Sequence, residues 1–257
     1  MRPNRILAAC AAVALTSAAL PGAAGAQAAT PGYVAAALAD KGRPAEDVQR
    51  DPDRKPEAML AFAGIRPGMA VVDFLPGRGY FTHIFAKAVG PTGTVLALYP
   101  PPRPSDDPAK PAPTPAAETI AADPAYANVK PVRAPFTALV VPAQADVFWT
   151  SQNYHDLHNV PGLDMAAFNK AVFAALKPGG VYVVLDHVGA PGDPAITHTL
   201  HRIDPAVVRR EVEQAGFLYV DESRVLRNPA DDHSLKVFDP LIRGHTDQFV
   251  FKFRKPG

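Results

Sequence analysis

The stretch Arg66-Pro67-Gly68-Met69-Ala70-Val71-Val72-Asp73-Phe74-Leu75-Pro76-Gly77-Arg78-Gly79-Tyr80 contains the pattern that best indicates how this chain folds. A turn at residues 66–68 precedes an apolar run at 69–75, which has the length of one buried strand. Gly77 and Gly79 then interrupt the run, and an apolar helical period begins at Tyr80. A strand, a glycine turn and a helix in this order are typical of a parallel α/β sheet.

Strands and helices continue to alternate along the chain after this unit. We expect further strands at 94–99, 129–132, 145–150, 181–187, 217–225 and 247–253, and helices at 57–63, 165–176 and 205–215. Such alternation gives a parallel sheet covered by helices on both faces, and the last two strands are predicted to pair as a hairpin. The predicted fold is therefore α/β: a Rossmann-like doubly wound, mostly parallel seven-stranded sheet with an antiparallel edge hairpin.

Residues 1–28 have the anatomy of a secretory signal peptide. Two arginines precede an uncharged, mostly apolar run from Ile6 to Leu20, which is shorter than a membrane span. A-x-A sites follow at residues 24–26 and 26–28, so we expect cleavage before Gln27 or Ala29. The mature protein is then predicted to be periplasmic or secreted, with no integral membrane segment after cleavage. It would also contain no cysteine, because Cys10 is the only one.

The rest of the chain divides into a short segment and one domain. Residues 29–56 are polar and rich in proline, and we expect them to wrap around a domain formed by residues 57–257. A Pro-rich insertion at 100–115 cannot be helix or central strand, and is either a surface insertion or a lid. Removing the signal peptide changes the formal net charge from +1 to −1, so no nucleic-acid footprint is visible.

Ligands of open parallel sheets bind beyond the carboxyl ends of the strands, where the strand order reverses. The glycine loop after the first strand lies at such an end. Gly77 and Gly79 allow close backbone approach, and the following helix presents free N–H groups to a polar ligand. The same pair of glycines is also compatible with a tight turn that binds nothing.

Three segments together resemble the class I S-adenosylmethionine-dependent methyltransferases, and the resemblance runs from about residue 56 to 253. They are Arg66-Pro67-Gly68-Met69-Ala70-Val71-Val72-Asp73, Gly90-Pro91-Thr92-Gly93-Thr94-Val95-Leu96-Ala97 and Leu176-Lys177-Pro178-Gly179-Gly180-Val181-Tyr182-Val183-Val184. More narrowly, Asn153-Tyr154-His155-Asp156-Leu157-His158 and the tail from His201 resemble an uncharacterised, often exported branch of predicted methyltransferases.

The resemblance implies S-adenosylmethionine as the cofactor and indicates which residues contact it. The family's glycine loop reads D/E-x-G-x-G-x-G, and Asp73, Gly77 and Gly79 match it, whereas Leu75 replaces the first glycine. The family also has an acidic residue at the end of the second strand, which binds the ribose. Tyr99 stands there in this chain, and it can stack on adenine or donate one hydrogen bond, but cannot accept two.

The polar residues 151–158 follow the fourth strand, where the family places substrate and methyl-donor contacts. His155 is the candidate general base, because histidine titrates near neutral pH, and Asp156 is the candidate that orients it. Tyr154 is a candidate cofactor or substrate contact. The alternative is a hydrogen-bonded loop cap without a catalytic role.

Several histidines and acids also invite comparison with metal sites. No compact H-E-x-x-H or H-x-H pattern is present, however, and Asp186-His187 follows a different strand, so we expect no metal site. Two functions remain open at this point. The first is methyl transfer from S-adenosylmethionine to a small molecule or an envelope component, and the second is an exported, non-catalytic binding protein on a methyltransferase fold.

Overall fold

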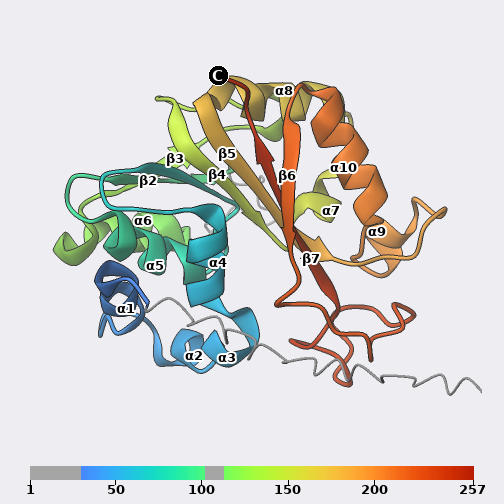
Figure 1. The fold of residues 1–257 in the computed structure, drawn as a ribbon, viewed down its shortest axis with the longest axis horizontal. Helices are drawn as coiled ribbons and strands as arrows, with labels where there is room; N and C mark the ends of the chain where they lie inside the picture. Colours follow the sequence, from blue (N-terminus) through green and yellow to red (C-terminus); the bar gives the residue numbers. More distant parts are fainter. Residues whose placement is uncertain (1–29, 102–112) are drawn as a thin grey trace, which may run out of the picture.

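A computed structural model describes residues 30–101 and 113–257, and it contains the predicted seven-stranded sheet (Figure 1). The strand order is β3-β2-β1-β4-β5-β7-β6. The strands are β1 Ala70–Phe74, β2 Thr94–Tyr99, β3 Val129–Arg133, β4 Ala145–Ser151, β5 Leu176–His187, β6 Leu218–Ser223 and β7 Gln248–Arg254. The predicted signal peptide and most of the Pro-rich insertion lie outside the described residues.

Strands β1 to β5 are parallel, and β7 is antiparallel to both of its neighbours. From β1 the chain builds one half of the sheet toward β3 and the other half from β4 onward, so the order reverses between β1 and β4. This is the switch point at which an open α/β sheet binds ligands. The predicted antiparallel pair is confirmed, with β7 inserted between β5 and β6 and the long segment 224–247 connecting the pair.

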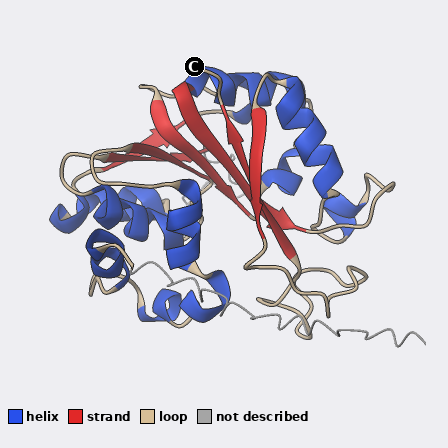
Figure 2. Cartoon of the chain, in the orientation of Figure 1, coloured by secondary structure: helices blue, strands red, loops and turns tan. Residues whose placement is uncertain are grey.

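Helices cover both faces of the sheet (Figure 2). The described helices are α1 Gly32–Leu38, α2 Ala45–Val48, α3 Asp51–Arg54, α4 Pro56–Ala63, α5 Tyr80–Val89, α6 Ala116–Ala122, α7 Tyr154–Leu157, α8 Met165–Ala175, α9 Ile196–Thr199 and α10 Pro205–Gln214. Helices α1, α4, α5 and α6 pack on one face, and α8 and α10 on the other. None of the described helices is long and apolar enough to cross a membrane.

Local sequence explains where the longer helices begin. The carboxylate of Asp164 accepts a hydrogen bond from the N–H of Ala166, at 2.8 Å, and caps the start of α8. Asp204 does the same for α10, where Pro205 occupies the first position and has no N–H that would need an acceptor. α5 instead begins after Gly79, whose left-handed backbone turns the chain out of the glycine loop.

The central strands are buried on both faces, and their side chains divide between two cores. Val71 and Trp149 pack into the core beneath α5, while Phe74 and Phe148 point into the core beneath α8. This double burial explains why β1 is apolar on both faces, apart from Asp73, and does not alternate. Trp149 is fully buried, as expected for a core residue.

Candidate functional site

The glycine loop after β1 has the backbone that its sequence requires. Gly77 and Gly79 have φ of 57° and 89°, in the left-handed region that glycine adopts without strain. Leu75 has φ of 52°, although it replaces the first glycine of the resembled family. Its N–H donates to the carbonyl of Leu98 at 2.8 Å, which joins the loop to the end of β2. The loop therefore keeps a glycine-like path with leucine at this position.

The two glycines differ in what surrounds them. A Cβ on Gly79 would lie far inside van der Waals contact with Cδ1 of Ile120 on α6, so this glycine lets two helices pack closely. A Cβ on Gly77 would meet nothing within 4 Å. Gly77 therefore leaves open space beside the loop, and it is the position at which a side chain would most directly obstruct a ligand.

Asp73 lies beneath the loop and is almost completely buried. Its Oδ2 accepts a hydrogen bond from the hydroxyl of Thr82 at 2.6 Å. Burial raises the pKa of Asp73 to about 7, even though Thr82 and the charge of Arg54 favour the ionised form. Asp73, the predicted cofactor contact, therefore lies beneath the loop, and its hydrogen bond with Thr82 connects the end of β1 to α5.

Asn153 lies directly after β4 and contacts the glycine loop from the other side of the switch point. Its Nδ2 donates to the carbonyl of Phe74 at 3.0 Å and to that of Leu75 at 3.4 Å. Its Oδ1 is buried and has no hydrogen-bond partner. Because an unpaired buried acceptor costs free energy, this oxygen indicates a donor that the protein itself does not supply.

Arg54, at the end of α3, brings a cation to the same place. Its Nη2 donates to Ser151 at the end of β4, at 2.9 Å, and its guanidinium lies 4.4 Å from the ring centre of Tyr80. Burial and the neighbouring Arg50 lower the pKa of Arg54 to about 10, so it stays charged at neutral pH. Among the described residues no carboxylate forms an ion pair with it. The positive charge is available to an anionic ligand.

Tyr99, at the end of β2, is part of a three-residue cluster. Its hydroxyl donates to Oε1 of Glu118 on α6 at 2.6 Å, and Arg133 at the end of β3 forms an ion pair with the same carboxylate at 2.5 Å. An acidic group is therefore present beside the end of β2, although it is carried by α6. No local pattern indicates this contact, because Glu118 is separated from β2 by the Pro-rich insertion.

His155 is buried and is held by a residue that the sequence did not link to it. Its backbone N–H and its Nδ1 contact the two carboxylate oxygens of Asp186 at the end of β5, each at 2.8 Å. Asp156 Oδ1 lies 3.3 Å from Nε2. Although burial alone would lower the pKa of His155, the two carboxylates raise it to about 10. A proton held this strongly weighs against the general-base role, which stays a prediction.

Tyr154 does not lie with the other predicted cofactor contacts. It is completely buried in the core beneath α8 and α10. Its hydroxyl donates to Oε2 of Glu211 and accepts from Nδ2 of Asn169, both at 2.8 Å. The side chain on this helical turn points away from the glycine loop, so its neighbour Asn153 is the residue that reaches the loop.

A cavity of about 480 Å³ opens beyond the ends of β4 and β5. In Figure 1 helix α3 and the long segment before β7 lie at the same end of the sheet, and both contribute residues to the lining of this cavity. Its polar lining comprises four arginines, one acid and three other polar residues, namely Arg50, Arg54, Arg78, Arg243, Asp53, Gln152, His187 and Gln248, and its apolar lining includes Leu185, Leu226, Val237 and Phe238. A basic rim over an apolar wall suits a small molecule with an acidic group.

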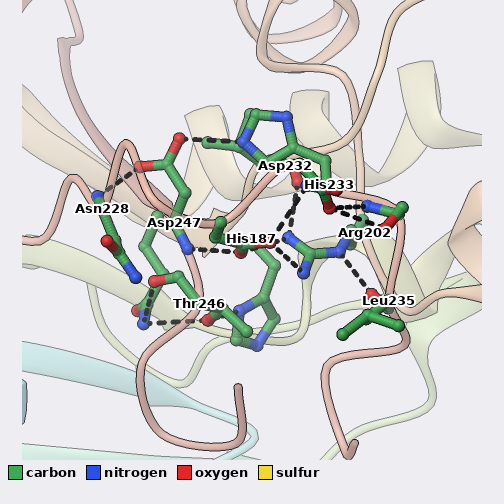
Figure 3. Close-up of polar contacts among 12 residues, drawn as sticks. His187, Arg202, Asn228, Asp232, His233, Leu235, Thr246 and Asp247 are labelled. Carbon is green, nitrogen blue, oxygen red and sulfur yellow. Dashed lines mark hydrogen bonds and ion pairs between the residues drawn. The ribbon is translucent and has the colours of Figure 1, made fainter. Parts of the chain in front are cut away.

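A hydrogen-bonded network fixes the segment that covers the cavity (Figure 3). His187 Nδ1 shares a hydrogen bond with the Thr246 hydroxyl at 2.7 Å, and Asp247 accepts from the backbone N–H of Asn228 at 2.8 Å. The Arg202 guanidinium donates to the carbonyl of Leu235 at 3.0 Å. Burial lowers the pKa of His187 to about 4, so its imidazole is neutral where it lines the cavity.

Comparison with known proteins gives no match to a family model and none to a curated protein by sequence. Solved structures do match. A methyltransferase from Aquifex aeolicus is 18% identical, with a TM-score of 0.53 over 83% of this chain and 99% of that chain. The 1,6-didemethyltoxoflavin-N1-methyltransferase of Burkholderia thailandensis, solved with S-adenosylhomocysteine, is 18% identical, with a TM-score of 0.52 over 82% and 80%.

A third structure with the same fold is named for a reaction other than methyl transfer. The (4+2)-cyclase SpnF is 15% identical, with a TM-score of 0.54 over 85% of each chain. The likeness to all three structures establishes the fold, which is that of the class I S-adenosylmethionine-dependent methyltransferases, as the sequence predicted. A fold of this kind does not by itself determine the reaction.

Proposed function

We propose that this protein transfers a methyl group from S-adenosylmethionine to a small acidic molecule bound in the cavity beyond β4 and β5. The observation that carries the proposal is the unpaired, buried Oδ1 of Asn153 beside the glycine loop. An ammonium group such as that of the cofactor's methionine part is a donor of the kind this oxygen lacks.

The surrounding residues fit the rest of the cofactor. The charged guanidinium of Arg54 lies beside the loop and suits the methionine carboxylate, since arginine recognises carboxylates through two parallel hydrogen bonds. The open space at Gly77 admits a ligand close to the backbone. At the far end, Glu118 beside Tyr99 offers the carboxylate that ribose hydroxyls require.

Methyl transfer requires the protein mainly to align the acceptor with the methyl group of the cofactor. The cofactor, when bound, supplies an electrophilic methyl group on a sulfonium centre, and the acceptor must approach this group in line. We propose that Arg243 holds the acceptor's acidic group at the cavity rim, together with Arg78, whose exposed guanidinium also forms an ion pair with Glu46 at 2.6 Å. The neutral His187 is placed to hydrogen bond the reacting end. His155 and Asp156 remain the sequence-based proposal for the base.

The second candidate is a non-catalytic binding protein. The observation that favours it is Tyr99, which stands at the end of β2 in place of the resembled family's ribose-binding acid. The name of the (4+2)-cyclase adds only that this fold also occurs outside methyl transfer. Export of the mature chain, which we also propose, would separate it from a cytosolic cofactor supply. Binding of S-adenosylmethionine together with methyl transfer would exclude this alternative.

The test is calorimetric titration of the mature protein with S-adenosylmethionine and S-adenosylhomocysteine, first for the wild type and then for Asn153→Ala. Losing a charge-assisted hydrogen bond of about 1.5 to 3 kcal/mol weakens binding by at least about tenfold. The matched control is Asn159→Ala, which removes a similar hydrogen bond to Thr197 away from the cavity and should bind as the wild type does. Equal affinity in all three folded proteins would refute this cofactor site.

A further inference from the structure

We propose that His155, Asp156 and His201 bind a divalent transition-metal ion of the zinc class through three protein ligands. His155 and Asp156 lie on α7, and His201 lies in the turn before α10. Methyl transfer itself needs no metal ion, but a His155 that binds one through Nε2 could not also act as the general base, so this proposal replaces that role. The sequence did not predict it, because two ligands are neighbours and the third is far along the chain, which matches no spacing motif.

The distances between the three ligand atoms suit a small ion. Oδ1 of Asp156 lies 3.3 Å from Nε2 of His155 and 3.4 Å from Nδ1 of His201, and all three atoms lie within 4.8 Å of one another. Zinc binds nitrogen and oxygen at about 2.0 to 2.2 Å, so two ligands of a tetrahedral ion are about 3.3 Å apart. The two ligand pairs that include Asp156 already have this spacing.

The buried Nε2 of His155 is the strongest sign of a missing partner. The His155 side chain is only 3% exposed, and its Nε2 makes no hydrogen bond, because Asp156 is near enough for an ion pair but not aligned to accept one. A proton on this nitrogen is attracted by the charge of Asp156 but has no aligned acceptor. A bound cation would displace this proton and take the Nε2 lone pair, with Asp156 as the neighbouring ligand.

Asp186 gives His155 the orientation that metal-bound histidines have. Such histidines almost always donate their other ring N–H to a carboxylate or carbonyl, which fixes the tautomer and aims the free nitrogen at the ion. Here Nδ1 contacts Oδ1 of Asp186 at 2.8 Å, and the other carboxylate oxygen accepts from the His155 backbone. Asp186 is completely buried and cannot turn away.

His201 is held toward the cluster at a cost in backbone strain. Its φ is 55°, in the left-handed region that is unfavourable for a non-glycine residue. The next residue, Arg202, is completely buried and forms an ion pair with Asp231 at 2.9 Å, which anchors the turn in the network of Figure 3. The His201 ring packs on Phe238, with ring centres 4.8 Å apart.

The cluster is open on one side. The side chains of Asp156 and His201 are 48% and 25% exposed, so an ion held by them would keep a coordination position for water or a ligand. Phe238 and His187, which line the cavity beyond β4 and β5, are the aromatic neighbours of His201 and His155. The proposed site therefore adjoins two residues of the cavity lining, although its own ligands do not line the cavity.

The test uses the mature protein without a polyhistidine tag, stripped of metal with a chelator and then titrated with Zn²⁺ and with Co²⁺. We expect one ion per chain, and for Co²⁺ the intense visible absorption of a tetrahedral site. Asp156→Asn and His201→Asn should each weaken Zn²⁺ binding by at least about tenfold. Asparagine is chosen at position 201 because it tolerates the left-handed backbone.

The matched control is His198→Ala, which removes an exposed histidine on α9 that is not part of the cluster, and it should bind Zn²⁺ as the wild type does. Circular dichroism establishes that each variant is folded. The proposal is overturned if the folded wild type binds no Zn²⁺ at micromolar concentration. It is also overturned if folded Asp156→Asn and His201→Asn bind as tightly as His198→Ala. Because the readout is metal binding, failure of methyl transfer leaves this result unaffected.

Discussion

Replacing Asp73 with asparagine should stabilise the protein at alkaline pH. Burial raises the pKa of this carboxyl from 3.8 to about 7. A group whose pKa is raised on folding contributes stability that is complete below the unfolded pKa and is lost as pH rises through the folded one. Each pKa unit corresponds to about 1.4 kcal/mol, so ionised Asp73 costs up to about 4 kcal/mol at pH 8 and above.

The change with pH in the stability difference between Asp73→Asn and the wild type can be predicted more precisely than the difference at any one pH. Ionisation of Asp73 lowers the free energy of unfolding of the wild type by about 1.5 to 2 kcal/mol at pH 5 and by about 4 kcal/mol at pH 8. The free energy of unfolding of Asp73→Asn should therefore rise relative to the wild type by about 2 to 3 kcal/mol between these values. A constant cost of fitting the amide beside Thr82 cancels from this difference.

Urea unfolding of both proteins at pH 5 and pH 8 measures this quantity. The control is Asp146→Asn at the opposite end of the sheet, which removes a partly exposed contact with Lys177 and should not be stabilised as pH rises. The free energy of unfolding of Asp73→Asn minus that of the wild type should increase from pH 5 to pH 8. A constant or smaller difference at pH 8 would show that the pKa of Asp73 is not raised by folding. If Asp73 also serves the cofactor, the more stable variant should bind S-adenosylmethionine less tightly.

Four further outcomes concern the site. Gly77→Ala should remain folded, at a cost of roughly 1 to 2 kcal/mol for its positive φ, and should weaken S-adenosylmethionine binding measured by calorimetry. Glu118→Gln should weaken the same binding by about tenfold if this acid holds the ribose. His187→Gln should lower single-turnover methyl transfer but leave cofactor affinity unchanged. If His155 is the base, the rate should rise with pH through neutrality toward pH 10, since its pKa is raised to about 10, and a flat profile would exclude that role.

The fold could be predicted because its signals are local in sequence. The apolar run of β1, the glycine loop and the helical period of α5 each lie within a few residues. The observed ends of most strands agree with these patterns to within about two residues. β5 is the exception and begins at Leu176, because Leu176 pairs with Ala145 before a bulge in the register. Pairing of this kind depends on a distant strand and leaves no local pattern.

The site could be predicted only in part, because its contacts join distant segments. In the sequence, Asp186 follows a different strand from His155, and this separation indicates no contact between them. The ends of neighbouring parallel strands nevertheless meet at one edge of the sheet, and β4 and β5 are neighbours. Arg54 reaches Ser151 across 97 positions, and no pattern in residues 29–56 indicates this contact. Asn153 was present in the recognised motif, but a choice between it and Tyr154 required knowing which side chain faces the loop.

The positions at which this chain departs from the resembled family bear on the choice between enzyme and binding protein. Leu75 keeps the glycine-like backbone, and its side chain packs against the core beneath α8, which offsets the strain of a positive φ. Tyr99 replaces the ribose-binding acid, yet its hydroxyl holds Glu118 at the same strand end. Leu75 thus preserves the backbone conformation of the loop, and Glu118 preserves an acidic group at the end of β2. A fold that had lost its ligand would be under no requirement to keep either compensation, or to leave the Asn153 oxygen buried and unpaired, so these residues favour a retained cofactor site over a relic.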